Sequence, residues 1–165
     1  MADTATYGYQ SIARAVLDHE IDTMFGLMGD ANLFMVDHYV RQGGGTFVPV
    51  AYEGSAVLMA LAWAHVSGKV GVATVTHGPA LTNCVTALTE GARGHIPMVL
   101  LAGDTFDAET PAPETLRQAL RAMGEEGDLT WVLLPGNHDS LAASELWRRV
   151  ASDRPAHLVG LATPA

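Results

Sequence analysis

The sequence predicts an α/β protein, with three α/β/α layers and a mostly parallel sheet of about six strands. Three observations predict this class. Helix-like and strand-like segments alternate along the 165 residues. The strand-like segments are apolar throughout, as in parallel sheets covered on both faces. The segments between them have helical spacing of apolar residues, and right-handed crossovers then place helices on both sides of the sheet.

In the first half of the chain, helices are predicted over residues 9–21, 33–42, 54–68 and 79–95, and strands over 22–30, 46–53, 69–78 and 96–104. The first helix gathers its apolar residues on one face. Asn32 is a suitable N-cap for the second helix, and the glycines at 43–45 end it. The third helix is rich in small residues, and the fourth opens with a proline, which the first helical position tolerates.

In the second half, a Pro/acid-rich loop over residues 107–114 runs into a helix over 113–127. A strand over 129–137, a helix over 140–153 and a strand over 155–164 follow. The helix over 113–127 is amphipathic, with Leu116, Ala119, Leu120 and Met123 expected to face inward. The sequence shows no internal repeat, so residues 1–165 are expected to form a single α/β domain.

Composition excludes several function classes. The formal net charge is −9, with a single lysine and no basic stripe, so no nucleic-acid partner is expected. Cys84 is the sole cysteine, which suits a reducing cytoplasm. The N-terminal residues do not form a signal peptide, and no apolar run approaches the roughly 20 residues that a membrane span requires. A soluble, cytoplasmic chain with no membrane partner is expected.

Polar residues stand where the predicted strands end. These are Asp30, Glu53, Thr76-His77, Asp104 and Asn137-His138. Parallel sheets bind ligands at the carboxyl ends of their strands, so this edge is the expected position of a site.

Three segments in order, "FGLMGDANLFMVD", "VAYEGSAVLMALAWAHVSGKVGVATVTHGPALTNCVTAL" and "GHIPMVLLAGD", carry a family resemblance. Residues 1–103 resemble the pyrimidine-binding (PYR) domain of thiamine-diphosphate-dependent enzymes, the acetolactate synthase and 2-oxo acid decarboxylase group. The resemblance implies that Glu53 bonds N1′ of the cofactor's aminopyrimidine and activates it. A different interpretation of Glu53 is an acid placed at the positive end of the helix that begins at residue 54.

The resemblance also suggests further ligand contacts from His77, Gly78 and Asn83. His77 follows a strand and stays open to a purely structural role. Ala80 departs from the family's usual Gly-Pro-Gly, and its methyl group is expected to narrow the approach to the ligand.

The family's diphosphate and Mg²⁺ motif, Gly-Asp-Gly followed by Asn, does not occur in this sequence. The resemblance therefore implies a separate diphosphate-binding (PP) domain or subunit, which would supply the Mg²⁺ contacts, in a homo- or hetero-oligomer. A lyase or transferase acting on a 2-oxo acid would be inactive without that partner. Which 2-oxo acid it would use is not readable from the chain.

Residues 104–165 resemble something else. "LLAGDTFD" and "WVLLPGNHDS" are similar to motifs of calcineurin-like metallophosphoesterases, which implies Asp104, Asn137 and His138 as ligands or acid of a divalent-metal site. The family's Asp-x-His and Gly-His-x-His motifs do not occur here, so that site would be incomplete. The alternative is a set of turn and cap residues.

The two resemblances meet inside "VLLAGD", which predicts a hybrid chain whose PYR-like part ends near residue 103. Three functions stay open. They are a PYR domain or subunit that uses thiamine diphosphate, a folded α/β domain without catalysis or cofactor, natural or recombined, and a metal-dependent phosphoesterase.

Overall fold

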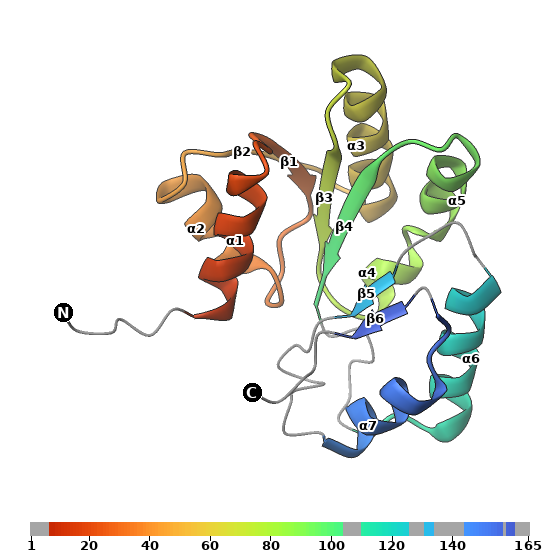
Figure 1. The fold of residues 1–165 in the computed structure, drawn as a ribbon. Coiled ribbons are helices and arrows are strands. Elements are labelled where there is room, and N and C mark those ends of the chain that lie inside the picture. Colours follow the sequence, from red (N-terminus) through yellow and green to blue (C-terminus); the bar gives the residue numbers. More distant parts are fainter. Residues whose placement is uncertain (1–6, 104–109, 126–130, 134–143, 157, 161–165) are drawn as a thin grey trace.

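The computed structural model describes residues 7–103, 110–125, 131–133, 144–156 and 158–160 (Figure 1). Its elements in chain order are α1 (Gly8–Asp18), β1 (Thr23–Gly26), α2 (Leu33–Arg41), β2 (Thr46–Pro49), α3 (Glu53–Ser67), β3 (Gly71–Val75), α4 (Pro79–Thr82), α5 (Val85–Arg93), β4 (Met98–Ala102), α6 (Pro113–Glu125), β5 (Trp131–Leu133), α7 (Ser144–Asp153) and β6 (Leu158–Gly160). None of the described helices is long and apolar enough to span a bilayer.

Six parallel strands form two sheets within the described residues. The larger has the order β2-β1-β3-β4, and β5 pairs with β6 alone. The predicted class, α/β with a parallel sheet, is confirmed. The six strands do not share one sheet, because α6, α7 and β6 bury their apolar side chains against one another rather than on the larger sheet.

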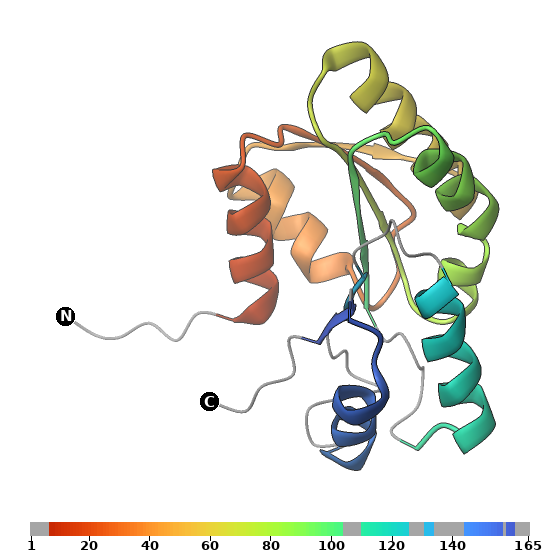
Figure 2. The same cartoon turned by 45° about the vertical axis from the view of Figure 1, so that its right-hand side comes forward.

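Helices cover both faces of the four-stranded sheet (Figure 2). Side chains alternate along its strands. Met24 and Val72 point into a core formed with α1 and α2, whereas their neighbours Phe25 and Ala73 point into a core formed with α3, α4 and α5. This alternation explains why the strands carry apolar residues at consecutive positions, as the sequence predicted.

The α3 helix lies very close to β3. A Cβ atom added at Gly71 would lie 2.1 Å from the carbonyl oxygen of Ala60, a distance that no side chain can occupy. The small residues of α3 allow this approach, since Ala56, Ala60 and Ala64 are all buried. The contact fixes α3, and with it the residue at its N-terminus, over the sheet.

A third core unites α6, α7 and β6. The inward positions predicted for α6 are confirmed: Leu116, Leu120 and Met123 are buried and Ala119 is partly buried. Trp147 of α7 packs in the same cluster. Figures 1 and 2 both show the β5–β6 pair beyond the carboxyl end of β4, so this unit lies toward the sheet edge where ligands are expected.

One predicted helix is divided in two. Residues 79–95 form α4 and α5, with Asn83 and Cys84 in a turn between them. The amide of Cys84 donates to the carbonyl of Leu81, three residues back, which tightens the chain at that point. The prediction of one continuous helix was wrong. The turn contains Asn83, which contacts a residue of the candidate site.

Candidate functional site

Glu53 is the first residue of α3, four residues beyond the end of β2, the strand that was expected to end on it. Its carboxylate is partly buried and sits in the first helical turn, where unpaired backbone N–H groups favour a negative charge. The two interpretations of Glu53 are therefore compatible: an acid at a helix N-terminus also faces the carboxyl edge of the sheet.

The turn between α4 and α5 brings Asn83 to this carboxylate. Nδ2 of Asn83 donates a 3.1 Å hydrogen bond to Oε2 of Glu53, across 30 residues of sequence. Among the described residues, no donor bonds the other oxygen, Oε1. The side chain is thus held by one oxygen and has the second available for a ligand.

Tyr52 also contacts the turn that holds Asn83, although the sequence pattern did not identify it as a site residue. Its hydroxyl donates to the carbonyl oxygen of Asn83 at 3.2 Å. A Cβ atom on Gly54 would lie 2.7 Å from the Tyr52 ring, so the absence of a side chain at Gly54 allows the ring to occupy this position. The only sequence indication was an aromatic residue immediately before the candidate acid.

Cys84 lies buried below the pair and does not offer a nucleophile. Its Sγ donates to the carbonyl of Ala80 at 3.3 Å. Burial, with the nearby Glu53 charge as a second cause, raises the pKa of the Cys84 thiol to about 11. The thiol is therefore protonated at neutral pH, and only the thiolate is reactive.

His77 and Gly78 follow β3 at the same edge of the sheet. Nδ1 of His77 shares a 3.1 Å hydrogen bond with the hydroxyl of Thr76. Gly78 precedes α4 with φ +51°, a left-handed conformation that glycine adopts without strain. The structure gives both residues a local structural role, and their contact with a ligand stays a prediction.

Ala80 does not narrow the site. It is 3% exposed and packs in the core between the sheet and α3 to α5. The expectation that its methyl group faces a ligand was wrong, because the first turn of α4 directs this residue into the core. The departure from Gly-Pro-Gly is thus a packing feature.

The residues of the predicted metal site, Asp104, Asn137 and His138, lie outside the described residues. Within the part that the structure describes, no three His, Cys, Asp or Glu side chains gather closely enough to hold a metal ion. The phosphoesterase prediction is therefore untested by the geometry.

Asn32 does not cap α2 with its side chain, contrary to prediction. It is 4% exposed, and its carboxamide bonds the loop between β1 and α2 and the side chain of Thr74. An asparagine side chain is suited both to capping a helix and to bonding a buried loop. A buried partner from β3, 42 residues away in sequence, decides between them.

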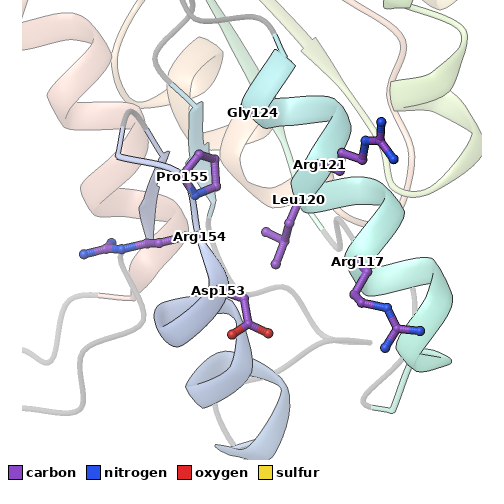
Figure 3. Close-up of a pocket in the computed structure, with 7 residues that line it drawn as sticks. All are labelled: Arg117, Leu120, Arg121, Gly124, Asp153, Arg154 and Pro155. Carbon is purple, nitrogen blue, oxygen red and sulfur yellow. The ribbon is translucent and has the colours of Figure 1, made fainter.

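A hollow of about 630 Å³ lies between α6 and the end of α7 (Figure 3). It is lined by Arg117, Leu120, Arg121, Gly124, Asp153, Arg154 and Pro155. Figure 3 shows the guanidinium groups of Arg121 and Arg154 extending in opposite directions, and Arg117 pairs with Glu114 at 3.1 Å. The guanidinium groups do not point toward a common position, so the hollow does not present an anion-binding site.

Comparison with known proteins relates the chain to curated enzymes. It is 36% identical over 96 residues to the acetolactate synthase isozyme 3 large subunit of Escherichia coli (strain K12), covering 58% of this chain and 17% of that protein. It is 35% identical over 96 residues to the acetolactate synthase of Mycobacterium leprae (strain TN), covering 58% and 15%. The chain therefore spans about a sixth of the length of these relatives.

A solved structure shares the fold. The benzoylformate decarboxylase of Polynucleobacter necessarius superposes with a TM-score of 0.52 at 16% sequence identity, covering 59% of this chain and 18% of that one. At this identity the likeness concerns the fold alone. It agrees with the parallel sheet and its two helical layers.

A family model, described as "Thiamine pyrophosphate enzyme, N-terminal TPP binding domain", matches residues 6–128. The match continues beyond the boundary predicted near residue 103, and the phosphoesterase resemblance of the later residues gains no support from these comparisons. Since the model covers most of the sequence, the chain belongs to the family of N-terminal TPP-binding domains of thiamine pyrophosphate enzymes.

Proposed function

We propose that this chain is the pyrimidine-binding part of an enzyme that uses thiamine diphosphate to act on a 2-oxo acid, with Glu53 as the residue that activates the cofactor. The observation that carries the proposal is the Glu53–Asn83 pair. One carboxylate oxygen is held at 3.1 Å by an amide, and the other is open at the carboxyl edge of the sheet. The names of the related acetolactate synthases supply the reaction class.

The residues present fit an aminopyrimidine ring. A ring nitrogen needs a carboxyl group that can hold a proton, and Glu53 is such a group with a free oxygen. The bond from Asn83 restricts rotation of the carboxylate, which keeps Oε1 in one position. Tyr52, about half exposed beside it, provides an aromatic surface next to the acid.

Proton transfer is the step assigned to this chain. Glu53 would hold or give up a proton at the nitrogen facing Oε1, in a position fixed by Asn83 and by the N-terminus of α3. When bound, the cofactor supplies the nucleophilic carbon and stabilises the negative charge left by decarboxylation. His77 and Gly78, at the end of β3, would border the ligand on its other side.

The cofactor's charged end requires a partner. The sequence contains no Gly-Asp-Gly motif, and the chain spans only 17% of the Escherichia coli relative. We therefore assign the diphosphate and Mg²⁺ contacts to a diphosphate-binding domain or subunit, in an oligomer. The cytoplasm is the proposed location.

The exposed side of α3 supports such a partner. Leu58, Met59 and Val66 are 52%, 38% and 86% exposed and share one helical face. Tyr52 and Val85 are also exposed, at 52% and 57%, and stand one residue before Glu53 and two residues after Asn83 in the sequence. We assign the surface, named here the α3 face, to the diphosphate-binding partner, because the helix that carries it begins with Glu53, which the partner's cofactor would approach.

Calorimetric titration tests the proposal. Thiamine diphosphate and Mg²⁺ are added to the chain alone and to the chain mixed with the diphosphate-binding domain of a related acetolactate synthase. Binding is expected only in the mixture, and Glu53→Gln is expected to weaken it about tenfold or more, which corresponds to about 1.4 kcal/mol. Thr86→Ala, an exposed change on α5, is the matched control and keeps full affinity. Binding that is indifferent to Glu53→Gln would refute the role of Glu53.

A further inference from the structure

The strand order makes the carboxyl ends of β1 and β3 the point where the winding of the sheet reverses, and general rules for parallel sheets expect a ligand crevice there. From β1 the chain moves outward to β2, and it then returns to the opposite side of β1 to form β3 and β4. The connection after β1 leads to α2 on one face of the sheet, and the connection after β3 leads to α4 on the other. Connections that diverge in this way open a ligand crevice at the carboxyl ends of the two strands.

A buried amide joins the two sides of this crevice. Asn32 stands at the start of α2 and is 4% exposed. Its Oδ1 accepts from the amide of Gly29 at 2.9 Å, and its Nδ2 donates to the carbonyl of Leu27 at 3.1 Å. These bonds fold the loop of residues 27–32 around the side chain.

The same Nδ2 reaches β3. It donates to the hydroxyl of Thr74 at 3.2 Å, and that hydroxyl donates in turn to the carbonyl of Leu101 in β4 at 3.1 Å. Thr74 is fully buried, and the two bonds use its hydroxyl as both acceptor and donor. These bonds connect the loop after β1 to β3 and β4. If Asn32 lost its donor, the buried hydroxyl of Thr74 would lack one of its two hydrogen-bond partners.

The loop of residues 27–32 packs against Thr76, the residue before His77. A Cβ atom on Gly29 would lie 2.9 Å from both Cβ and Oγ1 of Thr76, so the backbone of Gly29 lies directly against that side chain. The Thr76 hydroxyl shares the 3.1 Å bond with Nδ1 of His77. The position of Gly29 thus limits where Thr76, and through it the His77 ring, can lie.

We propose that Asn32 is a positioning residue that sets the spacing of the crevice and the orientation of the His77 ring for ligand binding. The proposal rests on the proposed function for the identity of the ligand. Its structural part, from Asn32 through Gly29 and Thr76 to His77, is independent of any cofactor.

The test uses Asn32→Asp, which keeps the shape of the side chain, removes its donors to Leu27 and Thr74, and places a carboxyl group at this buried position. Nitrogen NMR of the His77 ring and hydrogen exchange of the Leu27 amide, which donates to the carbonyl of Thr74 at 3.2 Å, are measured without ligand. We expect altered His77 ring resonances and at least about tenfold faster exchange at Leu27, because the tie from residue 32 to Leu27 and Thr74 is lost. Gln42→Glu makes the same amide-to-acid change at the exposed end of α2, and both readouts are expected to match the unmodified chain.

A second variant keeps the test informative if Asn32→Asp does not fold. Gly29→Ala leaves Asn32 intact and displaces the Thr76 side chain, so the same His77 resonances are expected to change. His77 resonances that stay unchanged in every folded variant would overturn the proposal.

Cofactor affinity of the assembled enzyme is measured last, and about a tenfold loss is expected in Asn32→Asp. Unchanged affinity alongside altered His77 resonances would overturn the binding part of the proposal. Failure of the proposed function is recognised separately, by cofactor binding that ignores Glu53→Gln.

Discussion

The amide of Asn83, in the turn between α4 and α5, donates to the carboxylate of Glu53, the first residue of α3, at 3.1 Å. Two consecutive crossovers of the sheet therefore meet at the candidate acid. Asn83 lies in the turn that divides the helical segment over residues 79–95 into α4 and α5.

Removal of the Asn83 amide is expected to weaken cofactor binding. In Asn83→Ala, Glu53 loses the donor that fixes its carboxylate, and affinity of the assembled enzyme for thiamine diphosphate is expected to fall roughly fivefold, or about 1 kcal/mol. Asn83 is exposed, so the melting temperature is expected to change little. Calorimetry and a thermal melt measure the two effects. An affinity equal to that of the unmodified chain would mean that Asn83 does not position Glu53.

The α3 face is expected to carry the partner contact. Leu58→Asp places a charge in the centre of this apolar surface and is expected to abolish assembly with the diphosphate-binding domain, measured by light scattering on a sizing column. Val40→Asp is the matched control, because Val40 is a comparably apolar residue, 38% exposed, on α2 at the opposite side of the sheet. Equal assembly by the two variants would exclude the α3 face as the interface.

Tyr39 is expected to make the fold sensitive to alkali. Its fully buried hydroxyl donates to the carbonyl of Ile21 at 3.0 Å, and burial, followed by the charge of Asp22, raises the pKa of Tyr39 from 10.0 to about 12. Because the folded-state pKa is raised, this stabilisation is complete below pH 10 and is lost as pH rises through about 12. The loss amounts to about 3 kcal/mol.

Urea unfolding at a series of pH values measures this loss. In Tyr39→Phe, stability near pH 7 is expected to be about 1 kcal/mol lower because the hydrogen bond is absent. Between pH 10 and 12 the variant is expected to lose less stability than the unmodified chain. Parallel curves for the two proteins would show that Tyr39 does not cause the alkaline loss.

The close approach of α3 to β3 is expected to tolerate no side chain. Gly71→Ala would place Cβ 2.1 Å from the Ala60 carbonyl, so α3 must move or the backbone must deform. A loss of about 3 kcal/mol or more in unfolding free energy is expected, as for other overpacked cores. Gly8→Ala is the control, because a Cβ there meets nothing within 4 Å, and its stability is expected to stay within about 0.5 kcal/mol. A similar stability for both variants would contradict this packing.

Much of the fold was predictable because apolar patterning reports which faces of an element are covered. Val72 and Ala73 are consecutive apolar residues that point into different cores, and Leu116 and Leu120 lie four residues apart on one helical face. Such patterns depend on local spacing alone. The division of six strands between two sheets was not predictable, since strand pairing depends on contacts between distant segments.

The candidate site was predicted in part. Glu53 was identified from the segments that resemble the family, and it lies at the expected edge of the sheet. Tyr52 was missed, and Asn32 was expected to act as a helix cap. Tyr52 touches the carbonyl of Asn83, and Asn32 touches Thr74, so both roles depend on partners at least 30 residues away.

The sequence by itself determined the α/β class and the order of its elements, because these follow from local periodicity and residue type, and its resemblance to the family identified the acid at the start of α3. Only the tertiary structure decided that Asn83 holds that acid and that Asn32 joins the connections around β1 and β3. A carboxamide is chemically suited to several roles, and the partner that folding brings within about 3 Å selects one of them.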